Sequence, residues 1–442
     1  MKRSKAFWPV VIILIGVVCM FALNRSMVLN ADTLKIYPQL EKFTDCLDKI
    51  QKYYVEEVPA DKLIDGAIKG MTSALDPHST YLTKEGYKEM QVTTTGSFGG
   101  LGIELGLREG VLTVITPIEG TPAFEAKIQP GDMIIKIDDK PTMDMTLDEA
   151  VKLLRGPKGT KVTITIQRGL KEKPFDVTIT RAIIHIESVK SMMLEPGYGY
   201  VRVRQFQVDT ADAIQKVMTD MAPNLKGLVL DLRYDPGGLL DQAIKVSDLF
   251  LSDGKIVSTD GRLPEDRKVF TARKPGTFEG FPIVALINGG TASAAEIVAG
   301  ALQDNKRAVI LGTKSFGKAS VQTVIPLSDG SALKLTVARY LTPSGQSIQA
   351  KGITPDIVVE QVLPENGGGQ KFLREKDLKQ HLEPLGKDKD KGTEEEELAP
   401  EEKLDLKRGV KPADMLRDDY QLKYALDLLK SWQVFDKHKK TT

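Results

Sequence analysis

Strand-like and helix-like segments alternate between residues 197 and 312, and this alternation constrains the fold more than any other feature of the chain. Short apolar runs typical of buried strands are separated by runs whose apolar residues recur every three or four positions. The strand-like runs are YGYVRV, GLVLDLR, PIVALIN and RAVILG, and the helix-like runs are DTADAIQKVMTDM, GLLDQAIKVSDLFL and SAAEIVAGALQD. Such alternation is typical of an α/β layer, in which helices cover parallel strands. We therefore predict an α/β core over residues 183–360.

Two regions of different character precede this core. Residues 96–182 contain short β-rich runs such as VLTVIT and KVTITIQR, separated by Gly and Pro, with a helical stretch at 147–154. This pattern predicts a compact β-rich module. Residues 31–95 contain two amphipathic helices, whose apolar faces indicate core packing or a dimer interface. Those faces consist of Leu40, Phe43, Leu47, Ile50 and Tyr54 in the first helix and Leu63, Ile64, Ala67, Ile68 and Met71 in the second.

The amino terminus carries a pattern that directs membrane insertion. Three basic residues, Lys2, Arg3 and Lys5, precede 18 apolar residues at positions 6–23. About 20 apolar residues span a bilayer, whereas the apolar part of a cleaved signal is about 7 to 15 residues long. We predict a membrane anchor within residues 1–30, with a cleaved signal sequence as the alternative. Because the positive charge stays in the cytoplasm, the rest of the chain is expected outside it.

The carboxyl-terminal region, residues 361–442, combines a charged linker with a helix. Residues 387–408 contain 15 charged residues among 22 and no apolar periodicity, which is typical of a solvated linker. The helix that follows needs a partner for its apolar face, either its own core or a second subunit. That face consists of Leu422, Ala425, Leu426, Leu429 and Trp432.

The overall composition excludes several classes of site and partner. Lys and Arg number 61 and Asp and Glu 60, so no excess of positive charge favours nucleic acid as a partner. The two cysteines, Cys19 and Cys46, are too few for a disulfide framework or a cysteine-built zinc site. The four histidines are scattered without metal-ligand spacing. We therefore expect neither a metal nor a cofactor.

Ser293 lies where an apolar strand gives way to a helix, in Asn288-Gly-Gly-Thr-Ala-Ser293-Ala-Ala-Glu296. Ser293 and Glu296 form the Ser-x-x-Glu pattern of a capping box, in which the hydroxyl only satisfies an amide of the first turn. The same turn would also present the hydroxyl beside free N–H groups that suit a developing oxyanion. The pattern leaves both interpretations open.

A nucleophilic serine needs a base, and Lys318 is the candidate. The chain has no Gly-x-Ser-x-Gly motif and no histidine in a context typical of a triad. A lysine in a loop is ordinarily solvated, and for half of it to be neutral its pKa must fall from about 10.4 to near 7, which only burial could achieve. Gln322, four residues later, would return to the same face of a strand, where its amide could orient the amine.

Two glycine-containing loops are further candidates for binding. Asp231-Leu-Arg-Tyr-Asp-Pro-Gly237-Gly238 follows a buried-looking strand and is either a turn with an Asp/Arg pair or a loop that aims an amide at a carbonyl. Phe98-Gly-Gly-Leu-Gly-Ile103 runs into a strand, and its amides suit a peptide carboxylate. Neither a dinucleotide fingerprint nor a phosphate loop fits, because Leu105 and Ala319 stand where those motifs require Gly and Ser or Thr.

These motifs occur in an order that resembles the carboxyl-terminal processing proteases, also called tail-specific proteases, of bacterial envelopes. The resemblance covers residues 37–360 and extends loosely to the last helix. Besides the loops above, it includes Leu75-Asp-Pro-His-Ser-Thr-Tyr-Leu82, Gly120-Thr-Pro-Ala-Phe-Glu-Ala-Lys-Ile-Gln-Pro-Gly-Asp132, Leu154-Arg-Gly-Pro-Lys-Gly-Thr160 and Phe316-Gly-Lys-Ala-Ser-Val-Gln322.

The resemblance implies a serine protease whose layered α/β core, similar to crotonase and Clp protease and covered by a cap, carries an inserted PDZ domain at 96–182. It implies Ser293 as nucleophile, Lys318 as general base and Gln322 as the residue that orients the lysine. The oxyanion hole would be formed by the Ala294 N–H and an amide of Gly237 or Gly238. The substrate's carboxyl terminus would bind in a groove formed by Phe98, Gly100, Leu101, Gly102, Ile103 and, as the basic residue, Arg155.

The sequence departs from the family pattern at three places near these residues. Ala295 stands where the family usually has Ser, Ala319-Ser320 replace Gly-Thr, and Asp235 replaces Asn. These changes leave the serine and lysine in place, so they bear on rate or regulation.

The resemblance implies an endopeptidase that cleaves proteins with exposed, apolar carboxyl termini. It further implies a location on the periplasmic side of the inner membrane, a homo-oligomer, and an activator or adaptor lipoprotein as a partner. Two alternatives come from other classes. One is a non-catalytic scaffold that binds peptides through the PDZ domain, and the other is an acyl-CoA hydratase or isomerase, which leaves the PDZ domain unexplained.

Overall fold

The central sheet of the computed structural model confirms the predicted parallel strands. Its order is β10-β11-β12-β15-β16-β19, and every neighbouring pair from β11 to β19 is parallel, whereas β10 is antiparallel to β11. The strands are β10 (Val189–Glu195), β11 (Tyr198–Val203), β12 (Gly227–Asp231), β15 (Ile283–Ile287), β16 (Ala308–Gly312) and β19 (Ile357–Val358). The structure describes residues 36–108, 110–169, 172–361, 372–383 and 411–441.

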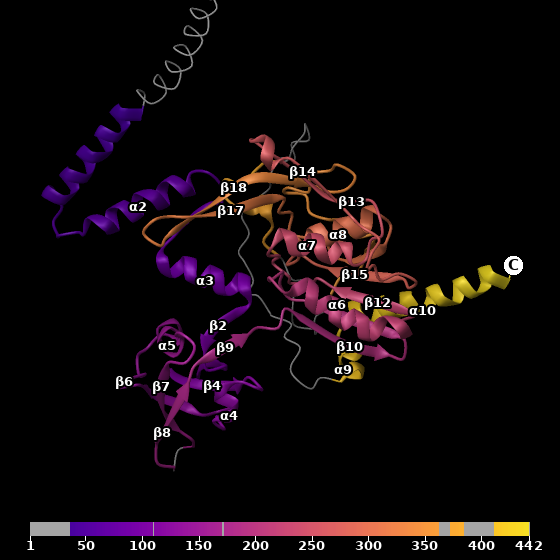
Figure 1. Cartoon of the computed structure of the whole chain (residues 1–442), viewed down its shortest axis with the longest axis horizontal. Helices are drawn as coiled ribbons and strands as arrows, with labels where there is room; N and C mark the ends of the chain where they lie inside the picture. Colours follow the sequence, from indigo (N-terminus) through magenta and orange to yellow (C-terminus); the bar gives the residue numbers. More distant parts are fainter. Residues whose placement is uncertain (1–35, 109, 170–171, 362–371, 384–410, 442) are drawn as a thin grey trace, which may run out of the picture. The chain divides into compact units, whose positions relative to one another are not determined.

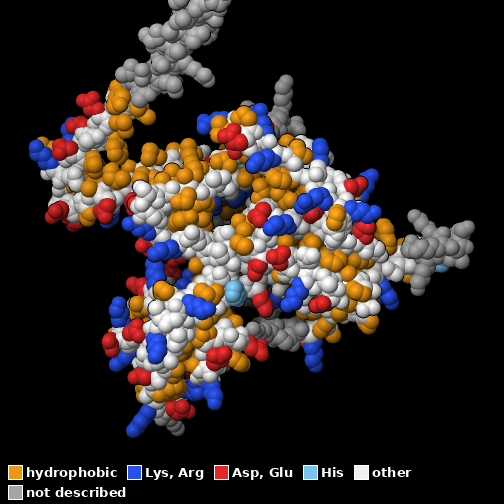
Figure 2. Space-filling view, viewed as in Figure 1, with side chains coloured by type: hydrophobic (Ala, Val, Ile, Leu, Met, Phe, Trp, Pro, Cys, Tyr) orange, Lys and Arg blue, Asp and Glu red, His pale blue; other side chains and the backbone are white. Residues whose placement is uncertain are grey.

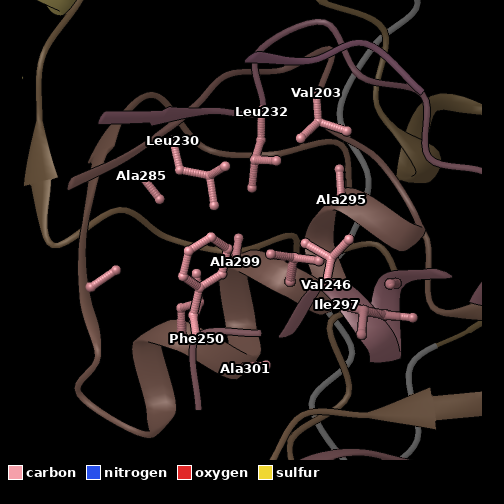
Figure 3. Close-up of a cluster of buried hydrophobic side chains, with 14 of the residues drawn as sticks. Val203, Leu230, Leu232, Val246, Phe250, Ala285, Ala295, Ile297, Ala299 and Ala301 are labelled. Atoms are coloured by element: carbon pink, nitrogen blue, oxygen red, sulfur yellow. The ribbon is translucent and has the colours of Figure 1, made fainter. Parts of the chain in front are cut away.

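Three helices cover one face of this sheet, as the alternation predicts. They are α6 (Thr210–Met221), α7 (Leu240–Asp248) and α8 (Ala294–Asp304). Their apolar side chains pack with those of β11, β12 and β15 in one buried cluster (Figure 3). Because α8 is buried along nearly its whole length, the core holds its first turn, which follows β15 in the chain, in a fixed position.

The carboxyl-terminal helix covers the opposite face. After α9 (Pro412–Asp418), α10 (Tyr420–Thr441) packs against β12, β15 and β16. Leu422, Ala425, Leu426 and Leu429 are buried there, so the core of the same chain covers the predicted apolar face. The prediction is wrong for Trp432, which is 55% exposed because it lies one turn beyond the sheet contacts of Leu429.

A second sheet lies on the far side of α7 and α8 (Figure 1). Its order is β1-β18-β13-β14, and β17 also pairs with β18. The strands are β1 (Thr80–Leu82), β13 (Lys255–Gly261), β14 (Lys268–Thr271), β17 (Ser320–Pro326) and β18 (Ala332–Leu341), and α3 (Lys84–Thr95) follows β1. The loop after β16 leads into β17, and the long strands β17 and β18 place residues of this segment beside the amino terminus of α8.

The β-rich module has its own sheet and its own core. Strands β3 (Ile103–Arg108), β4 (Val111–Pro117), β5 (Met133–Ile137), β6 (Lys140–Pro141), β7 (Lys161–Gln167) and β8 (Phe175–Thr180) form one sheet, with the helices α4 (Pro122–Glu125) and α5 (Leu147–Leu154). The strand β3 is at the edge of this sheet. A short ladder of β2 (Ser97–Gly100) and β9 (Ala182–His185) joins the two ends of the module to the rest of the chain.

The chain divides at Ala74 and Leu75 into two compact units. The described part of the first unit consists of a helix at residues 36–53 and α2 (Ala60–Ser73), where two helices are predicted. Several residues of their apolar faces, such as Phe43 and Met71, are exposed in this chain. The predicted anchor and the charged linker lie outside the described residues, among which no helix is long and apolar enough to cross a membrane.

Candidate active site

Ser293 occupies a strained turn between β15 and α8. It is the N-cap of α8, with φ 54° and ψ −114°. A positive φ is costly for a residue with a side chain, and such strain persists only where the surroundings impose it. The capping-box pairing with Glu296 also forms. Glu296 thus caps the first turn through the Ser293 N–H, and the strained backbone of Ser293 is a feature that capping alone does not require.

Glu296 joins the serine turn to the loop that carries Lys318. Its buried carboxylate accepts hydrogen bonds from the N–H groups of Ser293 at 2.8 Å, Lys318 at 2.9 Å and Gly317 at 2.8 Å, and from the Ser315 hydroxyl at 2.5 Å. Burial raises the pKa of Glu296 to about 7, although these four donors lower it. The carboxyl group thus fixes two distant segments of the chain against one another.

Tyr340 makes a second connection between the same two segments. This tyrosine of β18 is buried, and its hydroxyl lies 2.6 Å from the carbonyl oxygen of Lys318 and 3.2 Å from that of Ser293. Since a hydroxyl can donate to either carbonyl, Tyr340 holds the serine turn and the lysine loop at a fixed spacing.

The amine of Lys318 is partly buried and has no hydrogen bond or ion pair with any residue that the structure describes. Burial and, to a lesser extent, the nearby charge of Lys334 lower the pKa of Lys318 to about 8. Three carboxylates oppose this effect, those of Glu375, Glu296 and Asp76. A substantial fraction of Lys318 is therefore neutral near physiological pH.

One pocket of about 510 Å³ brings the predicted catalytic residues together. In Figure 2, a hollow beside β17 and β18 shows basic side chains within it. Residues of α3, β17 and β18 form much of the remaining wall. All six residues predicted as catalytic or oxyanion-binding line this pocket, namely Ser293, Lys318, Gln322, Ala294, Gly237 and Gly238.

Of the two glycines of the Asp231 loop, Gly237 lies against the serine turn and Gly238 lies against Phe206. The Gly237 N–H donates to Asp235 Oδ1 at 2.8 Å. In the described part of the chain, the N–H groups of Gly238 and Ala294 have no acceptor. A Cβ added to Gly237 would lie 2.8 Å from Ser293 Cβ and from the Ala294 nitrogen, so the loop fits at this point only because residue 237 lacks a side chain.

Asp235 itself is buried and forms no ion pair with any residue that the structure describes. Burial raises the pKa of Asp235 well above its ordinary value, and within the described structure its Oδ2 has no hydrogen bond. Burial thus favours the neutral form of this carboxyl group. In that form it can occupy the position where the family pattern has a neutral asparagine.

Gln322 lines the pocket, but its hydrogen bonds lead away from the lysine. Its Nε2 donates to Ser320 Oγ at 2.9 Å and to Thr336 Oγ1 at 3.3 Å. Thr336 Oγ1 donates in turn to Asp76 Oδ1 at 3.1 Å. Asp76 belongs to the Leu75–Leu82 motif, so this motif supports the wall of the pocket through Thr336.

A chain of buried polar groups supports the lysine loop from its other side. The Ala319 N–H donates to Gln349 Oε1 at 2.8 Å, and Gln349 Nε2 donates to Glu375 Oε1 at 2.8 Å. His78 Nε2 lies 2.7 Å from Glu375 Oε2. Ala319, which follows Lys318, is thus connected to both Glu375 and His78, which are almost 300 positions apart in the sequence.

The Asp/Arg pair of the glycine loop is part of a buried ionic network. Arg233, 2% exposed, forms hydrogen bonds to Asp231, Asp419 and Gln421, the last two from the carboxyl-terminal region. Burial by itself would raise the pKa of Asp231, but the Arg233 guanidinium lowers it to about 2. The network ties the glycine loop to the start of α10.

The residues predicted to bind a carboxyl terminus lie together in the β-rich module. Leu101 and Gly102 connect β2 to the edge strand β3, which begins at Ile103, and α5 contacts that strand. The Arg155 guanidinium lies 4.6 Å from the centre of the Phe98 ring. An edge strand beside a helix is the geometry that strand addition of a peptide requires.

Sequence reasoning missed two residues of the pocket, Tyr340 and Lys334, and the bridging role of Glu296. The capping pattern drew attention to Glu296 but gave no sign of its contact with residues 315–318. Tyr340 and Lys334 belong to an ordinary strand pattern, and β18 pairs with β17 at Lys334 and with β13 at Tyr340. Their roles depend on tertiary contacts, which no local signal encodes.

Comparison with known proteins agrees with this arrangement. Residues 197–359 match the model of peptidase family S41, residues 113–168 match a PDZ domain, and residues 23–86 match the activating protease CtpB N-terminal domain. The carboxy-terminal-processing protease of Bartonella bacilliformis is 45% identical over 421 residues, covering 92% of this chain and 93% of that protein. The carboxy-terminal processing protease CtpA of Bacillus subtilis is 38% identical over 375 residues, covering 83% and 79%.

Among solved structures, a photosystem II D1 C-terminal processing protease is 32% identical, covers 70% of this chain and 86% of its own, and has a TM-score of 0.43. The extent of the match with the Bartonella protein is decisive, because it includes nearly the full length of both chains. The fold is therefore an S41 protease core with an inserted PDZ domain, and the chain belongs to the family of carboxy-terminal-processing serine proteases.

Proposed function

We propose that this serine protease cleaves peptide bonds with a Ser293–Lys318 dyad. The observation that carries the proposal is the shared pocket. There, a serine on a strained turn faces the same cavity as a partly buried lysine whose pKa is lowered to about 8. Protein substrates follow from the family and from the PDZ domain.

In the proposed reaction, Ser293 Oγ attacks the carbonyl carbon of the scissile bond while its proton passes to the neutral amine of Lys318. The oxygen that becomes negative receives hydrogen bonds from the free N–H groups of Ala294 and Gly238. The C–N bond then breaks, and the Lys318 ammonium returns the proton to the leaving amine. Water hydrolyses the resulting acyl-enzyme by the same proton transfers in reverse order.

The contacts of Gly237 and Gln322 favour particular roles for these residues. Because the Gly237 N–H already donates to Asp235, Gly238 is the better oxyanion donor of the two glycines. Gln322 Oε1 remains available to accept from the Lys318 ammonium while its Nε2 is held by Ser320 and Thr336. We assign Gln322 to orienting the lysine through this oxygen.

We further propose that the PDZ domain binds the carboxyl terminus of the substrate. The support is the free edge of β3, the preceding Gly-rich turn and the Arg155 side chain beside Phe98. An anchor at residues 6–23 would hold the enzyme at the inner membrane, facing the periplasm.

Cleavage of an unstructured polypeptide by the full-length chain tests both proposals. The polypeptide is made with a free carboxylate or with a carboxamide at its terminus, and products are identified by mass spectrometry. We expect Ser293→Ala and Lys318→Ala each to reduce kcat/KM by about a thousandfold or more, and amidation to slow only the wild-type reaction. Full activity of either variant would overturn the dyad, whereas equal cleavage of both substrates would overturn the role of the PDZ domain. A chain that binds the free terminus but cleaves nothing would be a scaffold.

A further inference from the structure

Lys334 is a second lysine in the active-site pocket, and the proposed mechanism does not use it. It lies in β18, where it pairs with Val324 of β17, two positions from the pair formed by Thr336 and Gln322. Residues two apart in a strand point to the same face, so Lys334 shares the face of Gln322 and Val324. All three line the pocket that contains Ser293 and Lys318.

The Lys334 ammonium has no partner among the residues that the structure describes. Neither a hydrogen bond nor an ion pair is formed by its Nζ, although the side chain is only partly exposed. Burial lowers the pKa of Lys334, which shows that its charge is incompletely solvated. Long lysine side chains ordinarily extend toward water, so an unpaired lysine held within a pocket is unusual.

The carboxylate whose charge acts on Lys334, that of Asp76, already accepts other hydrogen bonds. Asp76 raises the pKa of Lys334 by its charge but makes no ion pair with it. Its oxygens accept hydrogen bonds from the Ser79 hydroxyl at 2.6 Å, from the N–H groups of Ser79 and His78, and from Thr336. With these donors in place, Asp76 balances the positive charge of the pocket only at a distance.

We propose that Lys334 forms a subsite that binds a carboxylate of the substrate, a few residues from the bond that is cut. This inference rests on the proposed function, because it assumes that a polypeptide occupies the pocket. The positive side chain of Lys334 and a partly apolar wall suit an extended peptide that carries one negative charge. A pocket with an unpaired cation gains most from a ligand that neutralises it.

The carboxylate has two chemically equivalent sources. One is the terminal carboxylate of a substrate cut close to its end, and the other is the side chain of Asp or Glu near the scissile bond. An extended chain advances about 3.3 Å per residue, so the position of the charge relative to the scissile bond is measurable with a peptide series.

Peptide binding to the full-length Ser293→Ala protein tests the subsite without requiring catalysis. One peptide series ends in a carboxylate or a carboxamide, and a second, amidated series carries Glu or Gln at successive positions. Each is measured with Ser293→Ala alone and with added Lys334→Met or Lys334→Arg. Lys268→Met, which removes an exposed lysine from β14 of the same sheet, is the matched control.

We expect Lys334→Met to weaken binding of one carboxylate peptide by about tenfold, the effect of losing one charge-assisted hydrogen bond. The neutral counterpart of that peptide should bind with the same affinity whether or not Lys334 is replaced by Met. Lys334→Arg should restore the preference for the carboxylate peptide, and Lys268→Met should leave the affinities of both peptides unchanged. Binding to the PDZ domain contributes equally in all the variants, so it cancels when their peptide affinities are compared. In the active protein the loss should appear as a rise in KM for the carboxylate peptide but not for its neutral counterpart, because the ion pair exists before the reaction begins.

Two results would overturn the subsite. One is an equal loss for charged and neutral peptides. The other is a Lys334→Met protein with unchanged binding and a shifted pH dependence of kcat, which would show that Lys334 acts only through Lys318. If carboxylate peptides bind as expected while the wild-type protein, which retains Ser293, cleaves no peptide, the proposed function fails and the subsite stands.

Discussion

At the scale of single residues, burial determines the protonation states in the pocket. Burial lowers the pKa of Lys318 to about 8 and raises that of Glu296 to about 7, so both groups titrate close to neutral pH. An exposed lysine is almost entirely protonated at that pH and accepts no proton from a serine. The motif around Lys318 identifies the residue, but only the surrounding fold explains why it can act as a base.

The pH dependence of activity follows from the lowered pKa of Lys318. Only the neutral amine is a base, so kcat/KM should rise with pH and reach half its maximum near pH 8. The charges that face the amine come from Lys334, Glu296, Glu375 and Asp76. A steady-state profile between pH 6 and 10 with an uncharged peptide measures this midpoint. An activity that is constant or falls across that range would contradict Lys318 as the base.

Replacing Glu296 tests the connection between the serine turn and the lysine loop. In Glu296→Gln an NH₂ group replaces one acceptor, so at least one of the four donors loses its hydrogen bond. We expect kcat/KM to fall by about tenfold to a hundredfold, the effect of a buried hydrogen bond to a charged group. Glu265→Gln, at an exposed glutamate, is the control. Equal activity of the two variants would show that Glu296 only caps the helix.

At the scale of secondary-structure elements, the periodic segments of the sequence are predictable and their partners are not. The alternation after residue 197 correctly predicts β11, β12, β15 and β16 with the helices between them. The second sheet is not predictable in this way, since β18 pairs not only with the preceding β17 but also with β1 and β13 from distant parts of the chain. Trp432 shows the same limit, because the helical period continues past the point where the sheet ends.

The glycine loop after β12 should tolerate no side chain at residue 237. Gly237→Ala would place a Cβ 2.8 Å from Ser293 Cβ, in addition to the cost of φ +95°. Gly276→Ala is the matched control, because its φ is +86° and its surroundings are open. Both variants should lose about 1 to 2 kcal/mol of unfolding free energy from the backbone conformation, but only Gly237→Ala should lose activity. Equal activities, measured with the same peptide, would contradict the contact between this loop and Ser293.

The attachment of α9 and α10 depends on the buried Arg233 network. Asp419→Ala leaves the Arg233 charge with one carboxylate instead of two, and a broken buried ion pair typically costs about 3 to 5 kcal/mol. Asp414→Ala removes an exposed ion pair with Arg417 and should cost less than about 1 kcal/mol. Urea unfolding measures both, and hydrogen exchange should rise in α10 only for Asp419→Ala. Similar losses in the two variants would refute the dominant role of the network.

At the scale of the whole molecule, the order of motifs predicts the family, and the fold explains why distant motifs belong together. The Leu75–Leu82 motif, the loop at 314–318 and the segment near Glu375 appear unrelated in the sequence. In the structure, hydrogen bonds join all three around Lys318. Lys334 brings a second lysine into the pocket. No sequence signal marks it, because its position depends on the pairing of β17 with β18.

The measurement that tests the dyad most directly is covalent labelling of the full-length protein with a fluorophosphonate, followed by mass spectrometry of its peptides. The account predicts one adduct, on Ser293, that is absent from Ser293→Ala and forms much more slowly in Lys318→Ala. Lys268→Met should be labelled at the wild-type rate. An adduct on another residue, or equal labelling of the wild-type and Lys318→Ala proteins, would contradict the Ser293–Lys318 dyad.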